Sequence, residues 1–243
     1  MASVDVVIPV YNEEKALPKS IPVLREFLAS EAFPYEWRIL IADNASIDNT
    51  PAVGRQLEDR YGGEVEYVRI ERKGRGFALK QVWLESPADI VSYMDVDLST
   101  GIEDFPKLIG AIAEKGYDVA IGSRLHRKSR VTRSLKRRVL TRGYNSIIKA
   151  MFLTRFSDAQ CGFKAMSRDA AQAILPLVED NNWFFDTEVL IIAEKAGYRV
   201  RDVPVRWIED TDTRVKIGAT VAEDLRGLWR LRRTRPWRGL AAK

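Results

Sequence analysis

The sequence is poor in cysteine and histidine, with one residue of each among 243. Cys161 alone cannot form an internal disulfide, and together with His126 it supplies too few nitrogen and sulfur ligands for a zinc site. This sparing use of cysteine is typical of a reducing compartment, so we expect a cytoplasmic protein.

Long apolar runs are also missing. No stretch reaches the roughly 18 to 20 uncharged residues that a membrane-spanning helix needs, and no basic segment precedes the first apolar run. We therefore expect neither a spanning helix nor a secretion signal. With 46% hydrophobic residues, a chain of this length can bury its core in one domain.

Acidic residues are absent from two basic segments. Residues 119–157 contain eleven lysines and arginines and residues 225–243 contain seven, while the net charge of the whole chain is only +5. Apolar residues at helical spacing accompany both segments, which is typical of helices that lie on an anionic membrane. Nucleic acid is the less favoured partner, because no recognised nucleic-acid motif accompanies the basic residues.

Short β-branched runs alternate with helical patterns in the first half of the chain. The expected strands are 4–10, 37–42, 65–70, 89–94, 118–121, 163–166 and 198–207. Further helices are expected at 134–152, 169–178, 187–196 and 219–233. This order predicts an α/β protein with a doubly wound, mostly parallel sheet flanked by helices, whose ligands bind at the carboxyl ends of the strands.

Acidic side chains follow two of these strands. Asp95 and Asp97 close the fourth strand at i, i+2 spacing, so both carboxylates leave the sheet on the same side. Together with diphosphate oxygens, they can hold Mg²⁺ or Mn²⁺. An isolated Asp-X-Asp is more often a surface turn, but Asp43 at the end of the second strand favours a nucleotide-diphosphate site.

Seven motifs occur in the order and spacing of one enzyme family. They are VVIPVYNEE, ADNASIDNT, MDVDLS, IGSR, DAQCGFKAMSR, FFDTEVL and VPVRW. The chain thereby resembles the family 2 glycosyltransferases of the GT-A fold, and within them the dolichyl- or polyprenyl-phosphate sugar synthases. The resemblance implies a metal-dependent, inverting hexosyltransferase that uses a nucleotide-sugar donor and a lipid phosphate acceptor.

The resemblance also implies residue roles. Asp95 and Asp97 would hold the metal, while Asp186 and Glu188 stand where the family has its acidic residue near the sugar. The candidates for nucleotide-sugar binding are Pro9, Tyr11, Glu13, Asp43, Lys80, Asp95, Asp97, Arg214 and Lys216. The last two lie in a loop after the final expected strand, where they can close over the diphosphate.

The nature of the acceptor site follows from charge. A phosphate monoester has a second pKa near 6, so it is a nucleophile at neutral pH and needs no strong general base. It needs cationic groups that position it for in-line attack. Arg124, together with Arg138 and Arg142 one turn apart on a helix, supplies that pattern and completes the catalytic set of Asp97, Asp186 and Glu188.

Two positions depart from the family pattern. Asn44 follows Asp43 where many relatives have a second acid, and Ser99 stands where relatives that use GDP-mannose often have glutamine. With the QCGFK, WFFD and VPVRW motifs, this favours UDP-glucose over GDP-mannose.

We expect residues 1–218 to form the GT-A domain and residues 219–243 to form a basic amphipathic helix and tail. The helix and tail would contact the inner face of the membrane or a partner. Larger members of the family carry spanning helices in addition to the GT-A domain. The enzyme would then either bind the membrane peripherally or use a separate membrane-protein partner.

Two other functions stay open. A family 2 transferase acting on a soluble saccharide or another hydroxyl would need a general base, for which Asp186 or Glu188 is the candidate. A membrane adaptor or nucleic-acid-binding protein without catalysis would keep the basic segments but would have no use for Asp95 and Asp97.

Overall fold

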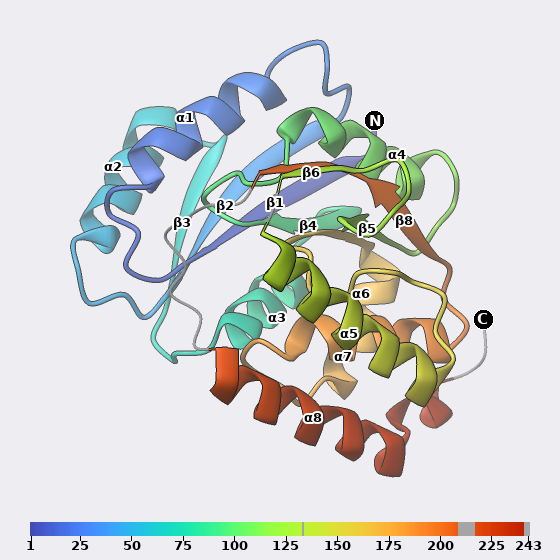
Figure 1. Ribbon diagram of the computed structural model, residues 1–243. Helices are drawn as coiled ribbons and strands as arrows, with labels where there is room; N and C mark the ends of the chain where they lie inside the picture. The colour runs from blue at the N-terminus through green and yellow to red at the C-terminus, as the bar shows by residue number, and fades with distance from the viewer. Residues whose placement is uncertain (133, 209–216, 241–243) are drawn as a thin grey trace.

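A seven-stranded sheet forms the centre of the protein in the computed structural model, which describes residues 1–132, 134–208 and 217–240 (Figure 1). Its strand order is β3-β2-β1-β4-β7-β5-β8. The strands are β1 Ser3–Val10, β2 Glu36–Asn44, β3 Val65–Ile70, β4 Ile90–Met94, β5 Val119–Ser123, β7 Phe163–Ser167 and β8 Val200–Pro204. Only β7 runs antiparallel to its neighbours in this sheet.

Helices cover both faces of the sheet (Figure 1). One face carries α1 (Leu17–Leu28), α2 (Thr50–Tyr61) and α4 (Phe105–Ala113), with the short 3₁₀ turn η1 (Ile102–Asp104) leading into α4. The other face carries α3 (Arg75–Glu85), α5 (Leu135–Phe152), α6 (Arg168–Ile174), α7 (Phe185–Lys195) and α8 (Ile217–Thr234). The 3₁₀ turns η2 (Leu175–Leu177) and η3 (Pro236–Gly239) follow α6 and α8.

Alternation along the strands builds two hydrophobic cores. In β1, Val6 and Ile8 point into the core under α1 and α4, while Val7 points into the core under α3 and α7. Successive strand residues face opposite sides, so a strand covered on both faces must be apolar throughout. This requirement explains the continuous apolar run that identifies β1 in the sequence.

A second, two-stranded sheet corrects the expectation of a single strand over residues 198–207. β8 ends at Pro204, and β9 (Arg206–Ile208) pairs in parallel with β6 (Arg130–Thr132). The break falls at Val205, whose N–H donates to the Ser129 hydroxyl instead of a sheet partner. β6 is not predicted by the sequence, because three residues within a basic run carry no periodic pattern.

The remaining strands and helices lie close to their predicted positions, and the α/β class, the mostly parallel sheet and the single domain are confirmed. Among the described helices, none combines the length and the apolar character needed to cross a bilayer. The carboxyl ends of β1, β2 and β4 meet at one edge of the sheet, and the reversed β7 begins at that same edge.

Candidate active site

Asp95 and Asp97 follow β4 at this edge. Met94 pairs with Phe163, which brings Gly162 against Asp95, and the N–H of Asp95 donates to the Gly162 carbonyl over 3.2 Å. A Cβ on residue 162 would lie 1.8 Å from Oδ2 of Asp95, so only glycine leaves room for this carboxylate. Asp97 is exposed, and its Oδ1 accepts a hydrogen bond from the N–H of Ser99 (2.9 Å).

The pair suits a divalent cation. The Asp95 side chain is half exposed beside the cradle that Gly162 provides, and Asp97 keeps one oxygen outside its turn. Within the described parts of the chain, no three His, Cys, Asp or Glu side chains converge on a metal position. Two carboxylates completed by substrate phosphate and water are the coordination that Mg²⁺ prefers.

Arg75 connects the acid pair to Asp186. Its guanidinium donates to Asp95 (3.0 Å) and to Asp186 (2.8 Å). It also contacts the rings of Tyr93 and Trp183, with its central carbon 4.9 and 5.2 Å from their centroids. One cation on α3 therefore holds together two carboxylates that come from β4 and α7.

Asp186 is surrounded by donors. Besides Arg75, the Lys164 ammonium lies 2.9 Å from its carboxylate, and the Tyr93 hydroxyl donates to it. Burial would raise the pKa of Asp186, but the charges of Lys164 and Arg75 and the Tyr93 hydrogen bond outweigh it, so the pKa is lowered. A general base works best with a pKa near the operating pH, so Asp186, with its lowered pKa, is poorly suited to that role.

Glu188 faces away from this network. It is fully buried, its carboxylate pairs with Arg230 of α8 (2.9 Å), and it accepts a hydrogen bond from the N–H of Asp180 (2.8 Å). These contacts attach α8 and the turn before α7 to Glu188. Glu188 thus has structural partners, although it lies only two residues from Asp186.

A buried carboxyl, Asp224, makes a second tie between α8 and the site. Gln160 donates to it over 3.3 Å, and it hydrogen-bonds with Tyr144, whose hydroxyl also contacts Thr187 (3.0 Å). Burial raises the pKa of Asp224 to about 7. The negative charge of Asp180 also raises this pKa, whereas the hydrogen bond with Tyr144 lowers it. The inner side of α8 thus touches residues that adjoin Gly162 and Asp186.

On the nucleotide side, Asp43 is fully buried at the end of β2. It accepts hydrogen bonds from the Ser46 N–H (2.9 Å), the Tyr67 hydroxyl (2.5 Å) and Arg69 (2.8 Å). Burial would raise the pKa of Asp43, but these hydrogen bonds prevail and lower it. An ionised carboxylate therefore fixes the loop at Ser46 and the side chains of Tyr67 and Arg69 at the end of β2.

Three other predicted nucleotide residues, Pro9, Tyr11 and Glu13, lie on the neighbouring β1 and in the loop that follows it. Pro9 and Tyr11 are partly buried at the end of β1, and the Lys73 ammonium lies 3.8 Å from the centroid of the Tyr11 ring. The N–H of Glu13 donates to the Thr50 hydroxyl (2.8 Å), which ties the loops after β1 and β2 together.

Asn44, the departure from the family pattern, has a structural partner. Its side-chain oxygen accepts a hydrogen bond from the N–H of Gly74 (2.6 Å), the residue before α3. An amide oxygen is sufficient for this contact, which positions the segment carrying Arg75.

The remaining predicted residues are dispersed. Lys80 donates to the Val178 carbonyl (2.8 Å) rather than to the acid pair, while Arg124 is held by two hydrogen bonds to buried Asp158 (2.8 and 2.9 Å). Arg124 lies close enough to Asp95 for that charge to contribute to its raised pKa. Arg138 and Arg142 are exposed on α5, and Arg214 and Lys216 lie outside the described residues.

The sequence does not single out Arg75 or Lys164. The glycines on either side of Arg75 are the sequence feature that could have indicated this site. A Cβ on Gly74 would lie 2.6 Å from the Asn181 carbonyl oxygen, and a Cβ on Gly76 would lie 2.5 Å from Cβ of Phe185. Two such glycines indicate a close backbone approach, here between the start of α3 and the turn before α7.

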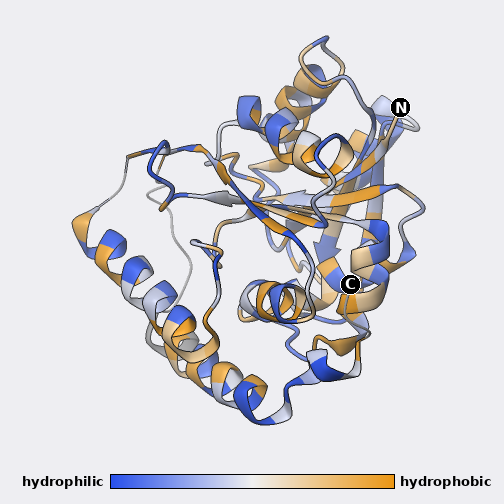
Figure 2. Cartoon of the chain, turned by 90° about the vertical axis from the view of Figure 1, so that its right-hand side faces the viewer, coloured by the Kyte–Doolittle hydropathy of each residue, from blue (hydrophilic) through white to orange (hydrophobic). Residues whose placement is uncertain are grey.

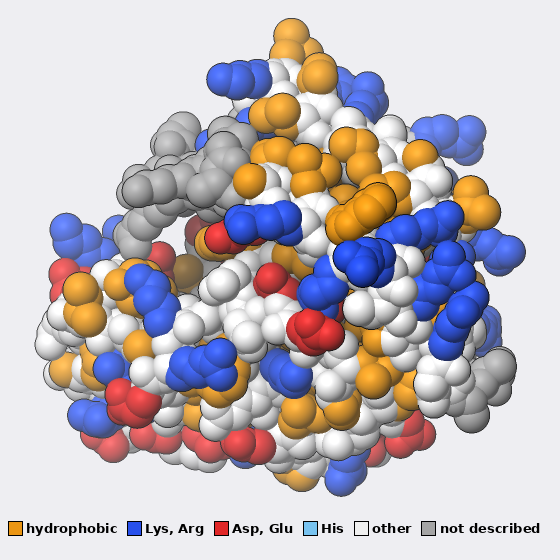
Figure 3. All heavy atoms as spheres, turned by 90° about the horizontal axis from the view of Figure 1, so that it is seen from below, with side chains coloured by type: hydrophobic (Ala, Val, Ile, Leu, Met, Phe, Trp, Pro, Cys, Tyr) orange, Lys and Arg blue, Asp and Glu red, His pale blue; other side chains and the backbone are white. Residues whose placement is uncertain are grey.

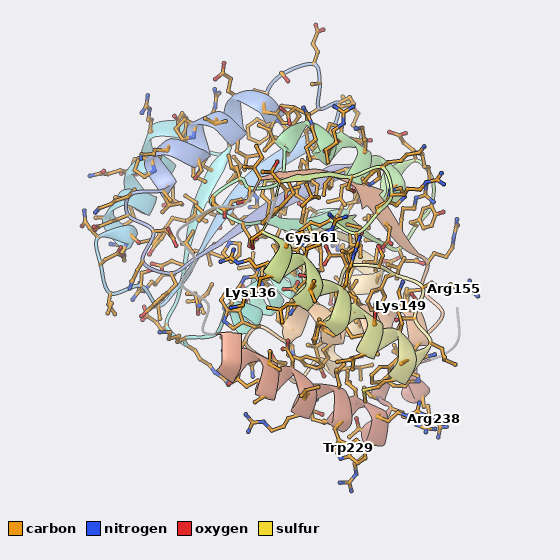
Figure 4. The ribbon with its side chains drawn as sticks, in the orientation of Figure 1. Lys136, Lys149, Arg155, Cys161, Trp229 and Arg238 are labelled. Carbon is orange, nitrogen blue, oxygen red and sulfur yellow. The ribbon has the colours of Figure 1, made fainter. Side chains whose placement is uncertain are left out.

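The outward sides of α5 and α8 carry apolar and basic side chains together, and we call this the α5–α8 surface. Its exposed apolar residues are Leu135, Val139, Leu140, Ile147, Val221, Leu225 and Trp229. Its exposed basic residues are Lys136, Arg138, Arg142, Lys149, Arg226, Arg232 and Arg233. Figure 2 shows both helices along one side of the molecule, Figure 3 shows hydrophobic beside basic side chains, and Trp229 points outward in Figure 4.

Comparisons with known proteins identify relatives of the chain. The sequence model described as glycosyl transferase family 2 matches residues 5–175. Glycosyltransferase AglD of Haloferax volcanii is 35% identical over 240 residues, which cover 94% of this chain and 37% of that protein. The dolichyl-phosphate beta-glucosyltransferase of Saccharomyces cerevisiae is 30% identical over 222 residues, covering 84% of this chain and 66% of that one.

The fold also matches a solved structure. Glucosyl-3-phosphoglycerate synthase from Mycobacterium tuberculosis, solved with Mn²⁺, UDP-glucose and phosphoglyceric acid, gives a TM-score of 0.69 at 18% identity, covering 95% of this chain and 79% of that one. The chain therefore has the architecture of that protein, while it spans 37% of the length of its archaeal relative.

Proposed function

Because the chain belongs to glycosyltransferase family 2, we propose that it transfers a hexose from a nucleotide-sugar to a polyprenyl phosphate. The observation that carries the choice of acceptor is the environment of Asp186. Arg75, Lys164 and Tyr93 all donate to this carboxylate, so it has little capacity to take a proton from a hydroxyl. An acceptor that is already ionised removes that need, and a lipid phosphate is such an acceptor at neutral pH.

The site residues divide the work of the transfer. Asp95 and Asp97 would hold Mg²⁺ or Mn²⁺, which neutralises charge on the leaving diphosphate. Arg124 uses Nε and one terminal nitrogen to bind Asp158, which leaves its other terminal nitrogen for the acceptor phosphate. A phosphate oxygen forms the new bond to the anomeric carbon as the bond to the diphosphate breaks on the opposite side, so the sugar inverts.

Glucose carried by UDP is the favoured donor. The yeast relative is named a glucosyltransferase, and the mycobacterial structure that shares the fold contains UDP-glucose. The fully buried carboxylate of Asp43 would act on the nucleotide only indirectly, by positioning Tyr67 and Arg69. Support for glucose thus comes from relatives, and a donor screen against GDP-mannose tests it.

The α5–α8 surface would bring the enzyme to its lipid acceptor. Its apolar side chains suit the headgroup boundary of a membrane, and each basic residue near an anionic surface adds on the order of 1 kcal/mol. We propose peripheral binding at the inner face of the membrane.

The decisive experiment compares two acceptors of equal chain length, a polyprenyl phosphate and the corresponding alcohol, with UDP-glucose and Mn²⁺. We expect glucosyl transfer to the phosphate alone. Asp97→Ala should abolish this turnover without lowering the melting temperature, while Asp59→Ala, at an exposed carboxylate on α2, should leave turnover unchanged. Equal transfer to the alcohol would refute the assignment of the acceptor.

A further inference from the structure

Trp183 is an exposed aromatic residue beside the acid network. Its side chain is 46% exposed, although it directly precedes the buried pair Phe184 and Phe185. The indole contacts the guanidinium of Arg75, which bridges Asp95 and Asp186. Tyr93, the other ring that contacts Arg75, is completely buried and cannot meet a ligand.

The segment that carries Trp183 is fixed before any ligand binds. The Asp180 carboxylate accepts hydrogen bonds from the N–H groups of Asn182 (2.7 Å) and Phe185 (3.0 Å), so the chain on both sides of Trp183 is held by one side chain. The Asn181 carbonyl accepts a hydrogen bond from the N–H of Phe77 (3.0 Å) on α3. An aromatic group held in this way meets a ligand at little cost in conformational entropy.

The position of the donor sugar follows from the proposed function, on which this inference rests. The diphosphate belongs at Asp95 and Asp97, and the hexose is bonded to that diphosphate, so it must lie next to these acids on the side of Asp186. Arg75 spans the distance between Asp95 and Asp186, and Trp183 covers Arg75.

We infer that the Trp183 ring packs against the apolar C–H face of the transferred hexose and thereby contributes to recognition of the donor sugar. A hexose has hydroxyl groups around its rim and C–H groups on its faces. Asp186 provides the acceptor for rim hydroxyls, and a flat, amphipathic indole complements a face. Trp183 is therefore a specificity-determining residue, separate from the groups that hold the diphosphate.

The test compares the sugar-bearing donor with the same nucleotide lacking the sugar. For Trp183→Leu, which removes the ring but keeps apolar volume, we expect kcat/KM for UDP-glucose to fall about tenfold, equivalent to about 1.4 kcal/mol. The inhibition constant of UDP should not change. Trp183→Phe, which keeps a smaller ring, should recover most of the loss.

Val23→Ala provides the control, because Val23 is 50% exposed on α1, which covers the face of the sheet opposite α3 and α7. With acceptor presented in detergent, it should leave kcat/KM for UDP-glucose unchanged. An equal weakening of UDP inhibition in Trp183→Leu would mean that the ring only supports Arg75, and unchanged kcat/KM would equally overturn the inference. Failure of the proposed function looks different, because the unsubstituted protein would then show no turnover with UDP-glucose.

Discussion

Gly162 occupies a position at which any side chain would displace the Asp95 carboxylate, the proposed metal ligand. Its Cα faces Asp95, and an added Cβ would lie 1.8 Å from Oδ2 and 2.4 Å from the carboxyl carbon. Real Cβ atoms do not approach other atoms so closely, and Asp95 is attached directly to the end of a buried strand. The carboxylate must therefore rotate away from the position that the metal requires.

We accordingly expect Gly162→Ala to reduce kcat by more than tenfold while the melting temperature changes little, because the Asp95 side chain has solvent into which it can turn. Gly143→Ala is the matched control: nothing lies within 4 Å of its added Cβ, and alanine favours the helix by about 1 kcal/mol over glycine. Assays of both variants at saturating Mn²⁺ would decide, and full activity of Gly162→Ala would contradict the placement of the metal at Asp95.

At the same scale, sequence patterns predict residues at strand ends better than residues that meet through folding. Asp43, Asp95 and Asp97 follow apolar runs and are visible in the sequence. Arg75 reaches Asp186 across 111 positions, and no local pattern encodes that contact. Glu188 shows that a motif can also mislead. Its motif predicts a residue near the sugar, but its carboxylate binds Arg230 of α8.

Among the elements, α8 combines two different surfaces. Its outer side belongs to the α5–α8 surface, and its inner side inserts Asp224 and Leu228 between α5 and α7. A carboxyl group buried in this way prefers its neutral form. The helix therefore carries a titratable group at an interface between elements.

Asp224 should make stability depend on pH. The pKa of Asp224 is about 7 in the folded protein and near 3.9 in the unfolded chain. Its contribution to the free energy of unfolding is therefore fully present below about pH 4 and is lost as the pH rises through 7. Because a single group titrates, the free energy of unfolding changes by at most about 1.4 kcal/mol per pH unit. We therefore expect the free energy of unfolding of Asp224→Asn, relative to that of the natural protein, to be higher at pH 8 than at pH 5. Urea unfolding at the two pH values measures this difference.

Asp59→Asn, at an exposed position of α2, serves as the control and should show the same difference in unfolding free energy at both pH values. If Asp224→Asn behaves like this control, Asp224 is ionised in the folded protein and the argument from burial fails.

The elements themselves differ in how far the sequence predicts them. β1, β2, β4 and β5 follow from buried runs bounded by turns, since burial on both faces leaves a continuous apolar signal. The division between β8 and β9 does not, because it depends on Ser129 capturing the Val205 N–H from another part of the chain. Long-range hydrogen bonds of this kind leave no periodicity to read.

At the scale of the whole molecule, the α5–α8 surface and the acid pair belong to one domain built on the central sheet. Apolar and basic side chains on the same outward faces suit an anionic bilayer, as described above. We propose that this surface contributes affinity for lipid; α1, α2 and α4 lie on the opposite face of the sheet.

We expect the protein to float with vesicles that contain anionic phospholipid and not with neutral vesicles, and raised salt should weaken this binding. The double variant Leu225→Ser and Trp229→Ser should lose most of it, because both side chains are exposed and apolar on α8. Val23→Ser, which removes an equally exposed apolar residue from α1, should float normally. Unaltered flotation of the double variant, or tighter binding to nucleic acid than to vesicles at matched salt, would refute this orientation.

The reversed direction of β7 has a consequence for how such a protein can diversify. A strand of ordinary polarity would deliver only its final residues to the catalytic rim, whereas β7 delivers the turn that precedes it, including Gly162. Residues from β1 to Asp97 and the turn around Gly162 therefore meet at the same rim, although they are far apart in the sequence. Insertions near residue 160 would therefore alter the rim beside Asp95, while insertions after Ser167 would emerge at the far rim.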